Sequence, residues 1–262
     1  MPESFLDTSP VWLLYAGTVL LLLGGNEAGF RIGRWRRTRM PEGEKAPATA
    51  IQGSTLGLLA FMLAFTFGMS GSRFDARKQL VLDETSAILR AHQRAQFLPE
   101  PQRSECSRLL RDYVELRIRV ATRQGLSELQ ELVTRSEGIQ DALWKEVTTL
   151  SERPSASLSI FVQSLSELTD LQMKRVRAAL WNRIPPTIVL TLYGIAFLAL
   201  TAMGYGAGLA ESRTTVPSVM LILTFSAIIV LIVDLERPRQ QLFEVSQQPM
   251  ADVARRIQSF QP

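Results

Sequence analysis

The chain has 262 residues, of which 46% are hydrophobic and 21% are charged, and its formal net charge is +4. A single cysteine excludes an intrachain disulfide, and one cysteine with one histidine gives no pattern for a transition-metal site. The arginines cluster beside long apolar runs, which is typical of membrane topology and lipid contact. They are not interleaved with aromatic residues as in nucleic-acid-binding surfaces. We therefore expect no nucleic-acid partner, no metal and no cofactor.

Four apolar runs are long enough to cross a bilayer as helices. A helix of about 18 or more apolar residues spans the hydrocarbon core and satisfies its own backbone there. We place the spans at about residues 11–29, 51–71, 187–204 and 216–233. The sequence thus predicts a multi-pass protein of the cell membrane, with the lipid bilayer as its surroundings. No ionisable residue lies at the centre of a span, which argues against a pump or a symporter.

The basic residues give two answers for the orientation in the membrane. Around the first span alone, the positive-inside rule places the N-terminus outside and the Arg31–Lys45 loop in the cytoplasm. Counted over all flanks, that side carries seven basic residues and the opposite side nine. The total count therefore favours the opposite orientation, and both orientations stay open.

The charged middle of the chain, residues 72–183, has the three- and four-residue apolar spacing of amphipathic helices. We expect helices at about 73–97, 102–123, 129–150 and 155–182, separated at Pro99–Pro101, Gly125 and Pro154. The first should continue from the second span, because no proline or glycine follows Gly71 before Pro99. The predicted fold is an all-α membrane protein with four transmembrane helices and a four-helix antiparallel domain inserted between the second and third.

This organisation divides the chain into four parts. Residues 1–71 form an N-terminal transmembrane pair, 72–183 a helical extramembrane domain, and 184–234 a C-terminal transmembrane pair. Residues 235–262 form a polar C-terminal tail, with a short helix from Met250 to Phe260.

The second span carries two adjacent patterns. One is a stripe of small residues that would let another helix approach closely: Gly53, Gly57, Ala60, Ala64 and Gly68. The other consists of Phe61, Phe65 and Met69, spaced by four residues. These patterns have two readings. The first is helix packing with lipid contact, and the second is a hydrophobic constriction that gates a pore by excluding water.

Few other residues suggest chemistry. Arg77 and Glu84 lie near the apolar stripe of the first extramembrane helix, where they form interhelical ion pairs or line an aqueous vestibule. We expect His92 on the surface and Arg237 as a basic anchor at the membrane interface. No catalytic constellation is present, and we predict that the chain is not an enzyme.

Several segments in a fixed order resemble the bestrophin-like domain family of unknown function. They are Gly57–Phe67, Arg73-Phe-Asp-Ala-Arg77, Glu84-Thr-Ser-Ala-Ile88, Leu98-Pro-Glu-Pro101, Asp234-Leu-Glu-Arg-Pro238 and Val245-Ser-Gln-Gln-Pro249. The resemblance implies a distant similarity to bestrophins, which are pentameric anion channels whose second span lines the pore with apolar residues one turn apart. It also implies a cytoplasmic helical domain. The sequence lacks the acidic calcium-binding cluster that bestrophins carry after the last span, so calcium gating is not expected.

The sequence leads to two functional hypotheses of different classes. The first is an oligomeric ion channel, a homo-oligomer that passes small ions, with five copies if the resemblance extends to the assembly. The alternative is a non-conducting, membrane-anchored helical module for sensing or assembly. A closed ring of subunits would favour the channel, and a monomer or a plain dimer would favour the anchor.

Overall fold

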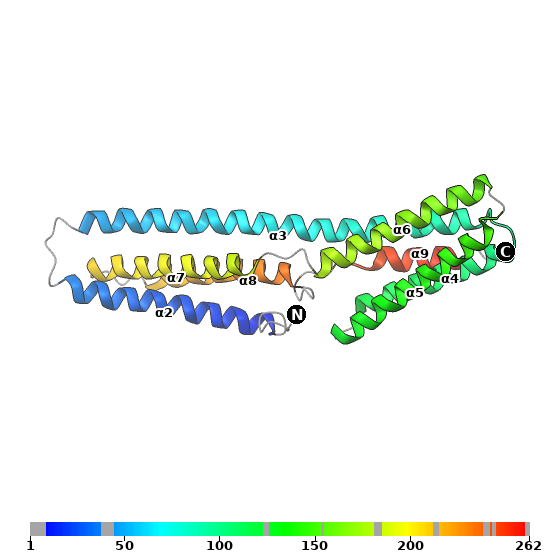
Figure 1. The fold of residues 1–262 in the computed structure, drawn as a ribbon. Helices are drawn as coiled ribbons and strands as arrows, with labels where there is room; N and C mark the ends of the chain where they lie inside the picture. The colour runs from blue at the N-terminus through cyan, green and yellow to red at the C-terminus, as the bar shows by residue number, and fades with distance from the viewer. Residues whose placement is uncertain are drawn as a thin grey trace. The chain divides into compact units, whose positions relative to one another are not determined.

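The structure is a computed structural model that describes residues 9–37, 45–122, 126–152, 155–180, 185–211, 215–237, 242 and 245–259. These residues form helices and no strands (Figure 1). The helices are α2 (Val11–Arg37), α3 (Lys45–Ala95), α4 (Gln102–Thr122), α5 (Leu126–Leu150), α6 (Ala156–Leu180), α7 (Pro186–Leu209), α8 (Thr215–Glu236) and α9 (Gln248–Ser259). The predicted all-α class is confirmed.

Backbone contacts divide the chain into two compact units. The membrane unit comprises Met1–Phe74 and Arg183–Glu244, and the helical unit comprises Asp75–Asn182 and Val245–Pro262. Helix α3 belongs to both, because its 51 residues run without a break from Lys45 to Ala95. This confirms that the second span continues directly into the first extramembrane helix.

The membrane unit contains α2, the first part of α3, α7 and α8. Within the described residues, four helices are long and apolar enough to cross a membrane: Val11–Arg37, Ile51–Ala95, Pro186–Leu209 and Val216–Glu236. These four helices coincide with the four predicted spans. Helix α2 extends eight residues beyond the predicted end of the first span at residue 29, because its arginine-rich continuation also stays helical.

The closest helix packing in the membrane unit is between α2 and α7. Glycines recur every four residues on both helices, at Gly25, Gly29 and Gly33 on α2 and at Gly204 and Gly208 on α7. A β-carbon at Gly29 would overlap the Thr201 carbonyl, and one at Gly204 would overlap the Asn26 carbonyl. The two backbones therefore touch without side chains between them, as in small-xxx-small helix pairs.

The remaining contacts of the membrane unit are made by larger apolar side chains. Leu59 and Leu63 of α3 pack in one cluster with Leu22 of α2, Ala196 of α7 and Ile222 of α8. Helix α3 is therefore joined to its neighbours through long side chains, whereas α2 and α7 are joined backbone to backbone.

The helical unit has its own core. The largest fully buried side chains there include Tyr113 on α4, Leu143 on α5 and Phe161 on α6, and the second part of α3 adds Ile88. The chain leaves α3 through a turn that ends at Pro101, as predicted. The predicted breaks at Gly125 and Pro154 lie outside the described residues.

Helix α9 is an additional part of this core that the sequence analysis assigned to a polar tail. Its Met250, Val253 and Ile257 are buried, and they recur at three- and four-residue spacing on one side of the helix. Apolar residues are too few here to dominate the local composition, but they are sufficient to anchor the helix to the core.

We predict that Gly204→Ala destabilises the membrane unit by at least about 2 kcal/mol, because the added methyl group meets backbone atoms of α2 that cannot move aside. Thermal unfolding of the protein in detergent, followed by circular dichroism, measures this. Gly194→Ala on the same helix is the control, since a β-carbon there has no atom within 4 Å and should be tolerated. Equal unfolding temperatures for both variants would contradict the close α2–α7 contact.

Candidate pore-lining helix and buried ion-pair network

In the membrane unit, α3 has one buried face and one face without a partner. Leu59, Leu63, Thr66 and Ser70 are buried, and together they form a narrow stripe. Phe61 lies two residues from both Leu59 and Leu63, which places it about 160° around the helix from each, at about 100° per residue. Accordingly, Phe61 is 63% exposed and Phe65 is 60% exposed. Met69, one turn further on, is half-buried.

The small-residue stripe lies on the same unpartnered side of α3. Gly53, Gly57, Ala60, Ala64 and Gly68 are all exposed, and β-carbons at Gly53, Gly57 and Gly68 would meet no atom within 4 Å. The stripe therefore makes no helix contact within the described chain. The close helix packing observed there is made by the glycines of α2 and α7 instead. Phe61, Phe65 and the stripe together form an apolar surface that this subunit does not cover.

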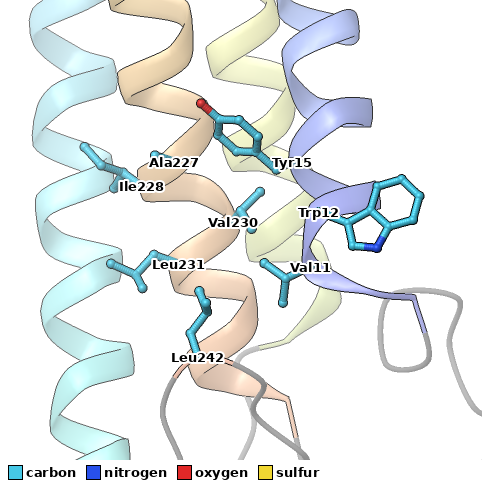
Figure 2. A pocket seen from close by; sticks show the side chains of 8 residues that line it. All are labelled: Val11, Trp12, Tyr15, Ala227, Ile228, Val230, Leu231 and Leu242. Atoms are coloured by element: carbon cyan, nitrogen blue, oxygen red, sulfur yellow. The ribbon is translucent and has the colours of Figure 1, made fainter.

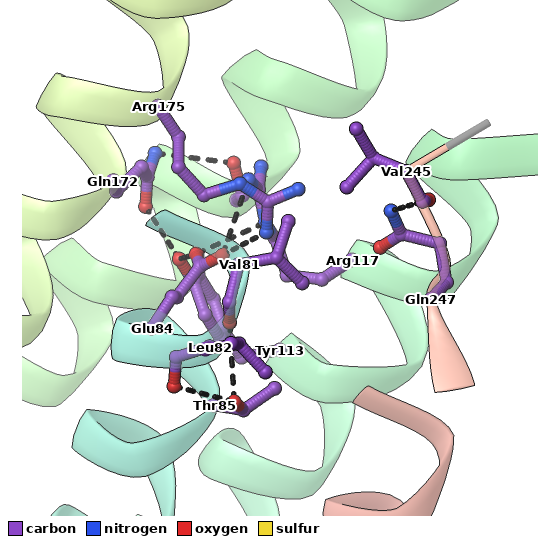
Figure 3. Close-up of polar contacts among 11 residues, drawn as sticks. Val81, Leu82, Glu84, Thr85, Tyr113, Arg117, Gln172, Arg175, Val245 and Gln247 are labelled. Atoms are coloured by element: carbon purple, nitrogen blue, oxygen red, sulfur yellow. Dashed lines mark hydrogen bonds and ion pairs between the residues drawn. The ribbon is translucent and has the colours of Figure 1, made fainter. Parts of the chain in front are cut away.

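The helical unit contains a buried ionic network centred on Glu84 of α3, whose side chain is fully buried (Figure 3). Arg117 of α4 lies 3.1 Å from it, measured from Nε to Oε1, and Arg175 of α6 forms a second ion pair. The two arginine side chains are only 3% and 14% exposed. One carboxylate thus holds two guanidinium groups from different helices.

Neutral side chains extend the network to a further helix. The Tyr113 hydroxyl donates a hydrogen bond of 2.6 Å to Glu84 and lies 3.1 Å from the side-chain oxygen of Gln172. The Gln172 amide donates to the Ser136 hydroxyl on α5 at 3.2 Å. The network therefore connects α3, α4, α5 and α6, and its hydrogen bonds repay part of the free energy needed to bury the charges.

The protonation states follow from these contacts. Burial by itself raises the pKa of Glu84, but Arg117, Arg175 and the Tyr113 hydroxyl outweigh it and hold this pKa below the ordinary value of a glutamate. Burial and the adjacent Glu84 raise the pKa of Tyr113 well above 10, so Tyr113 stays a neutral donor. At neutral pH the network therefore carries one negative and two positive charges.

The other residues singled out from the sequence lie as follows. Arg77 is half-buried on α3. The expectation that His92 lies on the surface is wrong, because α3 packs deeply in the helical unit and His92 is buried beside Ala91 and Ala95. Burial and the nearby Arg111 lower the pKa of His92, which favours a neutral imidazole.

We expected Arg237 as a basic anchor at the membrane interface, and the structure buries its side chain. Its side chain is 2% exposed, and its nearest carboxylate is that of Asp234, with 3.9 Å between NH1 and Oδ1. Arg237, directly after α8, therefore points into the membrane unit and not outwards. Sequence position after a span indicated the membrane interface but not the direction of the side chain.

Comparison with known proteins identifies the class. The model of the Bestrophin-like domain family matches residues 35–250. The fold is similar to that of a substituted bacterial bestrophin homologue from Klebsiella pneumoniae, with a TM-score of 0.71 and 17% identity over 96% of this chain and 98% of that one. It is also similar to the Klebsiella pneumoniae homologue solved by zinc phasing, with a TM-score of 0.69 and 16% identity over 95% and 98%. The comparison with curated proteins gave no match.

The fold and the four apolar helices define an all-helical membrane protein with the bestrophin fold. Since the family model covers most of its length, the chain belongs to the Bestrophin-like domain family. The resemblance inferred from the sequence segments is confirmed.

We predict that Glu84→Gln destabilises the protein by about 3 kcal/mol, because it leaves two buried guanidinium groups facing each other without a counter-charge. Chemical unfolding in detergent measures the change in free energy. Asp83→Asn is the matched control, since the Asp83 carboxylate, next to Glu84 in sequence, accepts a hydrogen bond from the exposed Gln79 side chain. Its removal should change stability by less than about 0.5 kcal/mol. Similar values for both variants would contradict the central role of Glu84.

We also predict a pH dependence of that difference. The pKa of Glu84 is lowered on folding. The ionised carboxylate therefore contributes fully to the free energy of unfolding above the unfolded pKa of about 4.3. As the pH falls below the unfolded pKa, Glu84 is protonated in the unfolded state while it is still ionised in the folded state. The contribution of Glu84 to stability is therefore lost between the unfolded and the folded pKa. The stability gap between wild type and Glu84→Gln should stay constant from pH 7 to about pH 5 and narrow below about pH 4. A gap that narrows already between pH 7 and 6 would contradict the lowered pKa.

Proposed function

We propose that several copies of this chain assemble around an axis and form an ion channel in the cell membrane, with the membrane part of α3 lining the pore. The observation that carries this proposal is the pair of adjacent patterns on the uncovered side of α3. Phe61 and Phe65 are exposed there, and a stripe of small residues with open space in front of it lies beside them. The family membership supports it, because bestrophins are channels.

Exposed phenylalanines alone would also fit a helix that faces lipid. The small residues therefore distinguish contact with another copy of the chain from contact with lipid. A helix facing only lipid gains nothing from a row of small residues, whose glycines expose backbone and weaken the helix. The same row lets the backbone of a neighbouring helix approach closely. We therefore assign the stripe to the contact between subunits.

The position of the stripe then sets the direction of the aromatic side chains. Ala64 lies about 100° before Phe65, and Gly57 lies about 40° before Phe61, at about 100° per residue. A neighbouring helix seated on the stripe thus leaves the phenylalanines beside it, free to point towards the axis of a ring. Phe61, Phe65 and Met69 follow one another at about 6 Å along the helix, which makes a neck of three apolar layers.

An apolar neck controls conduction through water. When it is narrow, ions would have to lose their hydration shell without any polar group replacing it, so the pore is closed. Widening admits water and restores conduction. Such a channel needs no catalytic group, which agrees with our prediction that the chain is not an enzyme.

We propose that the extramembrane part of α3 is held rigidly and does not line a vestibule at Glu84. The fully buried Glu84 side chain is bonded to three other side chains and has no surface to offer to passing ions. Its role in the proposed channel is to fix α3 against α4 and α6. The half-buried Arg77 keeps the vestibule role as a proposal.

We predict that Phe65→Ala raises ion flux through reconstituted vesicles several-fold, because a smaller side chain widens the neck and admits water. The measurement is efflux of monovalent ions from vesicles loaded with a fluorescent indicator. Leu223→Ala on α8 is the control, since this exposed apolar side chain lies on another helix and should leave the flux unchanged. An absence of flux from both wild type and Phe65→Ala would leave the non-conducting anchor module as the function.

We predict that Ala64→Trp breaks the assembly into smaller species, because an indole on the stripe keeps the neighbouring helix away. Native mass spectrometry of the protein in detergent gives the number of subunits directly. Leu190→Trp places the same bulk on an exposed position of α7 and should leave the number unchanged. A wild-type monomer or plain dimer would contradict a closed ring, and five copies would extend the bestrophin resemblance to the assembly.

A further inference from the structure

An apolar groove runs along the outside of the membrane unit between α2 and α8 (Figure 2). It encloses about 620 Å³, within the range of sites that hold small organic molecules. Its lining consists of apolar side chains and two aromatic ones, from Val11, Trp12, Tyr15, Ala227, Ile228, Val230, Leu231 and Leu242. A groove of this lining in a membrane-spanning bundle offers contact to a hydrocarbon chain and nothing to a polar ligand.

A buried cation without hydrogen bonds lies in the same part of the membrane unit. Arg237 follows directly after α8 and is 98% buried, yet none of its three side-chain nitrogens has a hydrogen-bond acceptor among the residues that the structure describes. Asp234 balances its charge at 3.9 Å but is too far away for a hydrogen bond. A buried guanidinium with five unused N–H groups is costly, and such groups normally indicate a bound ion, water or ligand.

One residue connects the groove to this cation. Leu242 lines the groove, and its backbone N–H donates a hydrogen bond of 2.9 Å to Oδ2 of Asp234, the ion-pair partner of Arg237. Leu242 thus links the lining of the apolar groove to the Asp234–Arg237 pair through one hydrogen bond.

The dimensions fit one leaflet of a bilayer. Ala227 lies ten residues before Arg237, and a helix rises about 1.5 Å per residue, so the groove extends about 15 Å from the level of the cation. This is about half of the roughly 30 Å hydrocarbon core. Trp12 and Tyr15, whose rings favour the membrane interface, lie in the first turns of α2 at this end.

We propose that the groove binds an anionic phospholipid, with one acyl chain along α2 and α8 and the phosphate on Arg237. A guanidinium binds two phosphate oxygens at once, and such charge-assisted bonds are among the strongest in proteins. A lipid with a net negative head group brings no second cation next to Arg237, whereas a choline head group does. The proposal depends on the membrane location of the unit and is independent of ion conduction.

The test is native mass spectrometry of the delipidated full chain after addition of phosphatidylglycerol or phosphatidylcholine. We expect the wild type to bind phosphatidylglycerol at least about tenfold more tightly than the Arg237→Gln variant does. A factor of this size is expected when hydrogen bonds to a charged group are lost. Arg31→Gln is the matched control, because this exposed arginine at the other end of α2 pairs with Glu27 and should bind lipid like the wild type. Ala227→Trp fills the groove without touching the cation and should weaken lipid binding as well.

Three outcomes would overturn the proposal. Equal affinities for the two lipids would exclude recognition of an anionic head group. If the Arg237→Gln variant unfolds at the wild-type temperature and still binds phosphatidylglycerol as the wild type does, Arg237 does not bind the phosphate. If inorganic phosphate binds the wild type and neither lipid does, Arg237 is a site for a free anion and not for a lipid. If Arg237→Gln fails to fold, Ala227→Trp decides: phosphatidylglycerol binding at wild-type strength by this variant would exclude the groove.

Discussion

The narrow buried face of α3 in the membrane is the constraint on which the rest of the structure depends. Leu59, Leu63, Thr66 and Ser70 are buried by the chain itself, whereas Phe61, Phe65 and the small-residue stripe are exposed. Helices α2 and α7 are joined differently, since their glycines bring the two backbones into contact. Under the proposed assembly, neighbouring copies of the chain cover this exposed face of α3, whereas a free-standing anchor would leave it to lipid.

The helical unit adds a second constraint on α3. The network around Glu84 fixes the later part of α3 to α4 and α6 with two ion pairs and a short hydrogen bond, all inside the core. Buried charges of this kind specify one arrangement of helices more strongly than they stabilise it, because any shift leaves a charge without its partner. Helix α3 is therefore held firmly in the helical unit while its membrane face stays available. The proposed pore-lining role of α3 requires both properties.

The sequence predicts those features that depend on local pattern and misses those that depend on distant partners. The four spans, the continuous α3 and the turn at Pro101 follow from hydropathy and from the positions of proline. The pairing of Glu84 with Arg117 and Arg175 does not, because the partners are 33 and 91 residues away and many arginines are available. The glycines of α2 and α7 also recur every four residues in the sequence. Because the small residues of α3 recur just as regularly, close helix packing was predicted for α3 and not for α2 and α7. For His92 and Arg237, position along the chain gave no information about the direction of the side chain.

The central claim is that the uncovered face of α3 surrounds a common axis. Spin labels at single cysteines, with Cys106 replaced, measure distances between copies of the chain in a reconstituted bilayer. The account predicts that labels at Phe61 give shorter distances between subunits than labels at Leu198, an exposed apolar position on α7. It also predicts one set of neighbour distances consistent with a closed ring. Absence of any dipolar signal at Phe61, or longer distances there than at Leu198, would place the phenylalanines against lipid and contradict the claim.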